Sequence, residues 1–206
     1  MVLRYCAYCG SEGPLTREHI WPKSLRRRLV KANDQKQSRF WLAKIKKVIV
    51  AEPTICDVCS VCNNIRLSSL DNYICELFDR FFIHIPQRYE HVTFDYDYHR
   101  LKRWLLKISF NSARIESSRD AFVFAPLLPY ILGNSESVGR AVLLYVQLSY
   151  PGNVPEEFLS DSDQRPQMFL PTMNRIGHMW FDLGPAGRKL LRAIHLRAFL
   201  FLSCFL

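Results

Sequence analysis

The segments Cys6-Ala7-Tyr8-Cys9-Gly10 and Cys59-Ser60-Val61-Cys62-Asn63 each contain a Cys-x-x-Cys pair, and these pairs decide how the first part of the chain folds. One such pair alone is weak evidence for a metal. Two pairs that flank a short polar region are typical of a structural zinc site, because such sites are tetrahedral, closed and rich in thiolate. We therefore predict a structural Zn²⁺ bound by Cys6, Cys9, Cys59 and Cys62.

A third cysteine near the second pair leaves an alternative open. Cys56 and Cys59 form an overlapping Cys-x-x-Cys pair, so Cys56 is an alternative ligand to Cys59 or Cys62. We favour Cys59 and Cys62, because Cys62 leads directly into Asn63 and an expected helix. The chain has seven cysteines, and its first residues lack the apolar core of a secretion signal. Together these features favour a reducing, cytoplasmic location in which cysteines bind metal.

The composition is that of an ordinary folded protein. Hydrophobic residues make up 49% of the 206 residues and charged residues 23%, which excludes a disordered chain. The uncharged run 198–206 is far shorter than the roughly 20 residues that span a bilayer, so we expect no membrane segment. The apolar alternation between Arg192 and Leu206 instead predicts one terminal core strand.

The positive charge is concentrated in the segment 22–50. This segment contains ten Lys or Arg residues and one acid, Asp34, so it alone accounts for the net charge of +9 of the chain. The basic residues are Lys23, Arg26, Arg27, Arg28, Lys31, Lys36, Arg39, Lys44, Lys46 and Lys47. Because a local basic block is the electrostatic footprint of a protein that binds the phosphate backbone, we expect DNA as the partner.

The apolar spacing predicts an α+β fold in two parts that meet near Pro86. We expect residues 1–85 to form one domain, with the basic segment 22–50 as an insertion, and residues 86–206 a small accessory α+β domain with one helix and several strands. The first part should contain strands at 15–20 and 47–50 and helices at 23–31 and 60–82. The second should contain a helix at 97–115, strands at 121–125, 142–149, 167–170 and 178–183, and the terminal strand.

The chain resembles the HNH endonucleases over about residues 3–80. The resemblance rests on Leu15-Thr16-Arg17-Glu18-His19-Ile20-Trp21-Pro22-Lys23-Ser24-Leu25 and on Cys59-Ser60-Val61-Cys62-Asn63-Asn64-Ile65-Arg66. It is similar to the zinc-stapled branch of that family, which has the ββα-metal fold. The resemblance implies that a histidine on a β-hairpin and an asparagine on the following helix face each other across a divalent cation.

The same resemblance implies roles for single residues. His19 would be the general base, since imidazole can take a proton from water near neutral pH. Glu18 and Asn63 would bind the catalytic cation, and their oxygen ligands suit Mg²⁺ or Mn²⁺ rather than zinc. Asn64 is an alternative to Asn63 as ligand. Arg66 would contact the scissile or an adjacent phosphate.

One departure from the family pattern concerns the orientation of the base. Many HNH proteins have an asparagine nine residues before the helix asparagine, and Thr54 stands there in this chain. The leading hypothesis is a metal-dependent endonuclease acting on DNA, with RNA as an alternative substrate. The competing hypothesis is a non-catalytic, zinc-ribbon-like module that binds nucleic acid or a partner. Residues 86–206 offer a surface for a partner protein, and the sequence leaves the oligomeric state open.

Overall fold

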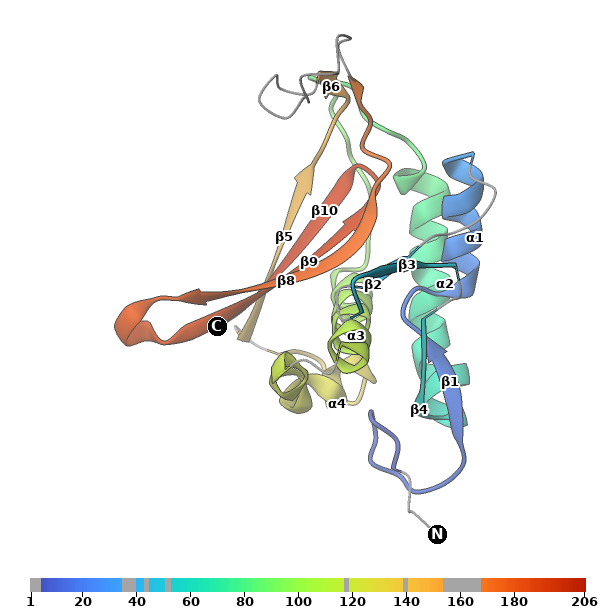
Figure 1. The fold of residues 1–206 in the computed structure, drawn as a ribbon, viewed down its shortest axis with the longest axis vertical. Coiled ribbons are helices and arrows are strands. Elements are labelled where there is room, and N and C mark those ends of the chain that lie inside the picture. Colours follow the sequence, from blue (N-terminus) through green and yellow to red (C-terminus); the bar gives the residue numbers. More distant parts are fainter. Residues whose placement is uncertain are drawn as a thin grey trace.

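The computed structural model describes residues 5–34, 40–42, 45–50, 53–116, 119–138, 141–153 and 168–206. Lys36, Arg39 and Lys44, which belong to the basic segment predicted to bind DNA, lie outside these ranges. The fold is mixed α+β, as predicted. A four-stranded antiparallel sheet lies on one side of helix α3 (Tyr98–Ile115), and helices α1 (Lys23–Ala32) and α2 (Ser68–Leu77) lie on its other side (Figure 1).

The N-terminal part is a strand pair followed by a long helix. Strand β1 (Leu15–His19) pairs antiparallel with β4 (Thr54–Cys59), and the chain then turns directly into a helix. This helix has π-helical ends, η2 (Cys62–Leu67) and η3 (Phe78–Phe82), on either side of α2. The predicted strand at 15–20 and helix at 60–82 are confirmed. Between β1 and β4 lie α1 and the small pair formed by β2 (Phe40–Leu42) and β3 (Lys47–Ile49).

The C-terminal sheet has the strand order β5-β10-β9-β8. Its strands are β5 (Val142–Leu148), β8 (Asn174–Asp182), β9 (Arg188–Leu196) and β10 (Phe199–Phe205). The smaller elements of this part are η4 (Arg119–Leu127), α4 (Leu128–Ile131), β6 (Gly152–Asn153), β7 (Met168–Phe169) and η7 (Gly184–Ala186).

Two of the predicted strands are wrong. The expected single terminal strand is the hairpin β9–β10, which turns at Arg197, where φ is 54°. The apolar alternation continues through both arms, so it carried no signal of the turn. The expected strand 121–125 lies inside the 3₁₀ helix η4. Its buried residues are Asp120, Phe124 and Leu127, which is a helical spacing rather than an alternation.

The hydrophobic core combines residues from both sides of Pro86. Phe82 lies against Phe199 of β10 with ring centroids 4.5 Å apart, and Trp21 lies 6.2 Å from Trp104 of α3. The division into domains 1–85 and 86–206 stays a prediction, but the two segments share one core in the folded chain. Within the described ranges, no helix has the length and apolar character needed to cross a membrane.

Candidate zinc centre and hairpin site

Four cysteine thiols converge where the N-terminal loop meets the end of β4. The Sγ atoms of Cys6, Cys9, Cys59 and Cys62 all lie within 4.8 Å of one another. Zn–S bonds of about 2.3 Å in tetrahedral geometry require sulfur atoms about 3.8 Å apart. The Cys9 and Cys59 Sγ atoms are 3.8 Å apart. The donor set therefore fits a tetrahedral Zn²⁺, and the predicted grouping of these four cysteines is confirmed.

Backbone amides donate hydrogen bonds to two of the four sulfur atoms, while burial raises the pKa of the Cys62 thiol. The backbone amide of Cys59 donates to Cys6 Sγ (3.3 Å), and that of Cys62 donates to Cys59 Sγ (3.5 Å). Burial raises the pKa of the Cys9 thiol, but hydrogen bonds from Ser11 and the neighbouring thiols outweigh it and lower the pKa to about 6. Cys56 is exposed and lies outside the cluster, so the alternative ligand set is not the one that the fold assembles.

The Cys6–Cys9 loop is attached to helix α3 by Tyr8. The Tyr8 hydroxyl donates to Asn111 Oδ1 (2.6 Å), and its ring meets Phe110 edge-on at 5.2 Å. Burial raises the pKa of Tyr8 well above its ordinary value, so the hydroxyl remains a donor. The loop also pairs with β4 through the amide of Ala7, which donates to the carbonyl of Asp57 (2.8 Å).

His19 is the last residue of β1, at the end of the strand pair away from the cysteines. Its Cα partner on β4 is Thr54. The strand pairing thus brings the expected base beside the residue that stands where the family has an orienting asparagine. His19 is half-buried, and after it Ile20 and Trp21 enter the core.

Asn63 lies against β1 from the first turn of the helix. Its Nδ2 atom donates to Thr16 Oγ1 (2.8 Å) and to the carbonyl of Arg17 (3.0 Å). The side-chain amide nitrogen of Asn63 is thereby fixed to the strand that carries His19. Its side-chain amide oxygen is the atom left to accept a hydrogen bond or to bind a cation. Asn64 is exposed, and its carbonyl accepts from the Ser68 hydroxyl (2.6 Å).

Glu18 points into the protein and forms a buried ion-pair cluster. Its Oε1 atom accepts from Lys107 Nζ (2.8 Å) and from Asn111 Nδ2 (3.1 Å). Lys107 also donates to both carboxylate oxygens of Asp71, at 2.7 and 2.6 Å. Burial alone lowers the pKa of Lys107, but Asp71 and Glu18 outweigh it and raise the pKa. The ammonium group therefore stays charged between two carboxylates.

This arrangement does not fit the divalent cation that the family resemblance implies. Glu18 is 4% exposed, and Lys107 at 0% exposure already neutralises its carboxylate. Within the described ranges, the cysteine cluster is the single group of three or more acidic, histidine or cysteine side chains placed to hold a metal. The Glu18 carboxylate, paired with Lys107, is therefore not placed to bind Mg²⁺ or Mn²⁺.

Arg66 lies at an open cavity of about 430 Å³ beside the cysteine cluster. Its Nη1 atom donates to Asn134 Oδ1 (2.7 Å). The cavity is also lined by Cys9, Glu12 and Ser60. Arg66 is thus directed toward the loop after α4.

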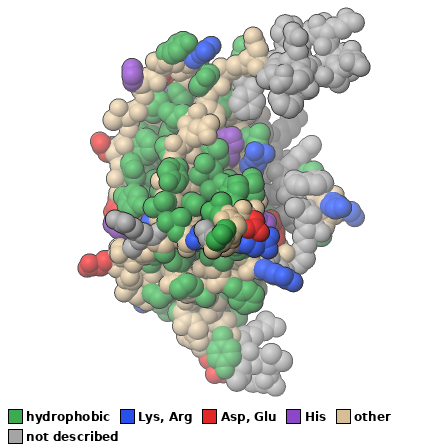
Figure 2. Space-filling view, turned by 90° about the vertical axis from the view of Figure 1, so that its left-hand side faces the viewer, with side chains coloured by type: hydrophobic (Ala, Val, Ile, Leu, Met, Phe, Trp, Pro, Cys, Tyr) green, Lys and Arg blue, Asp and Glu red, His purple; other side chains and the backbone are tan. Residues whose placement is uncertain are grey.

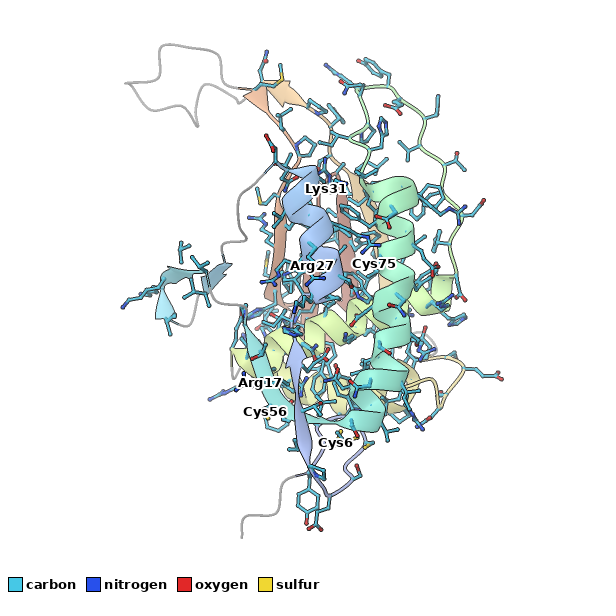
Figure 3. All side chains as sticks on the ribbon, turned by 90° about the vertical axis from the view of Figure 1, so that its right-hand side faces the viewer. Cys6, Arg17, Arg27, Lys31, Cys56 and Cys75 are labelled. Atoms are coloured by element: carbon cyan, nitrogen blue, oxygen red, sulfur yellow. The ribbon has the colours of Figure 1, made fainter. Side chains whose placement is uncertain are left out.

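Exposed basic side chains of β1 and α1 precede and follow His19 in the chain, and we call them the basic face. It consists of Arg17 on β1 and Lys23, Arg27 and Lys31 on α1, all of them exposed. In Figure 3, Lys31, Arg27 and Arg17 follow one another along the same side of the molecule. The three α1 residues recur every four positions, about 6 Å apart along the helix. The one acid between Arg17 and Lys31 is the buried Glu18, so no acidic side chain of this stretch weakens the face.

No family model, curated protein or solved structure matches the chain.

Proposed function

We propose that the chain is a zinc-stapled nuclease that binds DNA along the basic face and hydrolyses phosphodiester bonds beside His19. One observation supports the proposal: His19 ends β1 and stands in the chain between Arg17 and Lys23 of the basic face, while Asn63 is hydrogen-bonded to the same strand. The four-cysteine cluster at the opposite end of the strand pair fits a zinc-stapled module. This is the order of parts that the resemblance to HNH endonucleases implies.

The proposed chemistry uses the histidine as base. His19 accepts a proton from the water whose oxygen attacks the phosphorus. The bond from phosphorus to the leaving 3′ oxygen breaks, and that oxygen takes up a proton from solvent. The cationic side chains of the basic face hold the phosphate backbone, so that the scissile bond lies beside the strand end. Asn63, fixed through its amide nitrogen, keeps β1 in register with the helix that follows the cysteines.

Replacing His19 by alanine is expected to slow DNA cleavage by about 10²- to 10⁴-fold, the usual contribution of a general base. DNA affinity and melting temperature should change little, because His19 is only half-buried. The measurement is the conversion of supercoiled plasmid to nicked and linear forms. Separate arms with Mg²⁺, with Mn²⁺ and with no added divalent ion distinguish a metal-assisted reaction from a metal-independent one.

The matched control is His91→Ala, which removes an exposed histidine outside the strand pair. It should cleave like the wild type. Cleavage by His19→Ala at the wild-type rate would remove His19 from the reaction.

Replacing Lys23, Arg27 and Lys31 together by glutamine is expected to weaken DNA binding and its dependence on salt. Each lost phosphate contact reduces the slope of log K against log[salt] by about one. The slope should therefore become smaller by about three units in fluorescence-anisotropy titrations from low to moderate salt.

The control variant changes the net charge by the same amount, at three exposed arginines that do not belong to the basic face: Arg88, Arg119 and Arg188. Their joint replacement by glutamine should leave the slope near the wild-type value. Equal losses in both triple variants would mean that overall charge, rather than the basic face, binds the DNA.

The ion pair between Glu18 and Lys107 favours a second candidate function, a non-catalytic module that binds nucleic acid. In that case the salt-dependent binding above persists, and plasmid stays intact in every metal arm. Parallel assays with single-stranded RNA separate the two nucleic acids as substrate or ligand.

A further inference from the structure

The outer face of the C-terminal sheet contains a hollow. Gly177 of β8 and Ala193 of β9 are Cα partners, and the hollow lies over the bare Cα of Gly177 and the methyl group of Ala193. Met179 and Leu191 line one end, and Leu200 of β10 lines the other. The hollow has a volume of about 340 Å³, at the lower end of the range of roughly 300–1,000 Å³ for small-molecule sites. Figure 2 shows hydrophobic side chains gathered over this side of the molecule.

A histidine and an arginine stand side by side in the wall of the hollow. His195 and Arg175 are Cα partners on β9 and β8, and both line the cavity. His195 is 7% exposed, and among the described residues neither of its ring nitrogens has a hydrogen-bond partner. A buried imidazole without partners costs free energy, which a ligand that hydrogen-bonds to it would recover. Burial, together with the nearby charge of Arg175, lowers the pKa of His195, so the ring can donate without carrying charge.

We propose that this hollow binds a small amphipathic anion, an apolar carboxylic acid whose body lies on Gly177 and Ala193 and whose carboxylate meets His195 and Arg175. The apolar walls suit a hydrocarbon body, and the carboxylate would accept one hydrogen bond from the imidazole and a charge-assisted bond from the guanidinium. The site lies on the sheet, apart from the strand pair β1–β4, and is independent of the proposed nuclease activity.

Three probes separate the contributions of the carboxylate head and the hydrocarbon body of the ligand. They are compared by isothermal titration calorimetry of the full chain. Octanoate has both parts, acetate has the head alone and 1-octanol has the body alone. Saturable binding of one octanoate per chain is expected, with acetate and 1-octanol each at least about tenfold weaker. Equal affinity for octanoate and 1-octanol would overturn the proposal, because His195 and Arg175 would then contribute nothing. Absence of saturable octanoate binding would overturn it as well.

Gly177→Val tests the floor of the hollow. A Cβ at Gly177 meets open space, and valine suits a strand, so this variant should fold. Its side chain should fill the hollow and weaken octanoate binding by more than about tenfold. The control is Gly152→Val, since Gly152 also lies in a strand with open space for a Cβ but does not line the hollow. Octanoate binding by Gly177→Val that matches the control would contradict the site.

Arg175→Gln tests the head group. The variant should bind octanoate about tenfold more weakly, because one charge-assisted hydrogen bond is lost, and its affinity for 1-octanol should not change. The control is Arg188→Gln, which removes an equal charge from the far end of β9. An equal effect of both variants would assign the binding to general electrostatics and overturn the site.

Discussion

A chain in which Cys59 is replaced by serine is expected to lose its zinc and to melt roughly 10 °C or more below the wild type. A zinc ion held by the four cysteines would connect the Cys6–Cys9 loop to the junction of β4 and the helix, and zinc binding in isolated zinc-finger peptides contributes on the order of 10 kcal/mol to folding. Tyr8 and Ala7 hold the same loop without metal, so we expect a smaller loss, about 4 kcal/mol.

The matched control is Cys56→Ser. Cys56 belongs to the same strand, three residues before Cys59, and is exposed outside the cluster. This variant should keep one zinc per chain and melt like the wild type. Zinc content by mass spectrometry and melting by scanning fluorimetry provide the measurements, and a Co²⁺ titration reports thiolate ligands by their charge-transfer bands. Full zinc occupancy in Cys59→Ser would contradict the predicted ligand set.

Replacing Lys107 by methionine is expected to cost about 3–5 kcal/mol of folding free energy, the usual result of removing one partner from a buried ion pair. The buried Glu18 and the partly buried Asp71 would then lack the one cation that pairs with both carboxylates. The measurement is chemical denaturation of the full chain. Adding Glu18→Gln and Asp71→Asn to Lys107→Met should restore much of the loss, because the remaining groups are neutral.

The exposed ion pair between Arg28 and Asp79 supplies the comparison. Its atoms are 2.8 Å apart, but its side chains are 36% and 50% exposed. Arg28→Met should cost no more than about 1 kcal/mol, since water screens such a pair. If Lys107→Met and Arg28→Met have the same effect, the buried cluster does not stabilise the fold.

The sequence predicts the parts of the site whose signals are local. The spacing of Cys6, Cys9, Cys59 and Cys62 is sufficient for the zinc cluster, because each pair fixes a tight turn that presents both thiols. The long helix after Cys62 follows from apolar periodicity, and the extended segment before Pro22 follows from the restriction that a proline places on the residues before it. The α1 charges at four-residue spacing likewise predict one exposed side of a helix.

The surroundings of Glu18 could not be predicted, because they depend on contacts between distant segments. Glu18 meets Lys107 and Asn111 of α3, about ninety positions along the chain. Lys107 is one of several buried polar residues of α3, with Lys102 and Asn111, and the sequence pattern does not show which acid pairs with it. The β9–β10 turn was missed for another reason, since Arg197 is neither glycine nor asparagine despite its positive φ.

The attachment of Tyr8 and Glu18 to α3 sets an order of assembly during synthesis. The Tyr8 hydroxyl donates a hydrogen bond to the Asn111 side chain, and the Glu18 carboxylate accepts one from it. Neither group has this partner until the ribosome has produced the chain beyond Asn111. The cysteines that precede it are made long before their surroundings are complete. Zinc captured early would hold β1 and β4 together while the Glu18 carboxylate is still in water, and the later packing of α3 would bury it against Lys107.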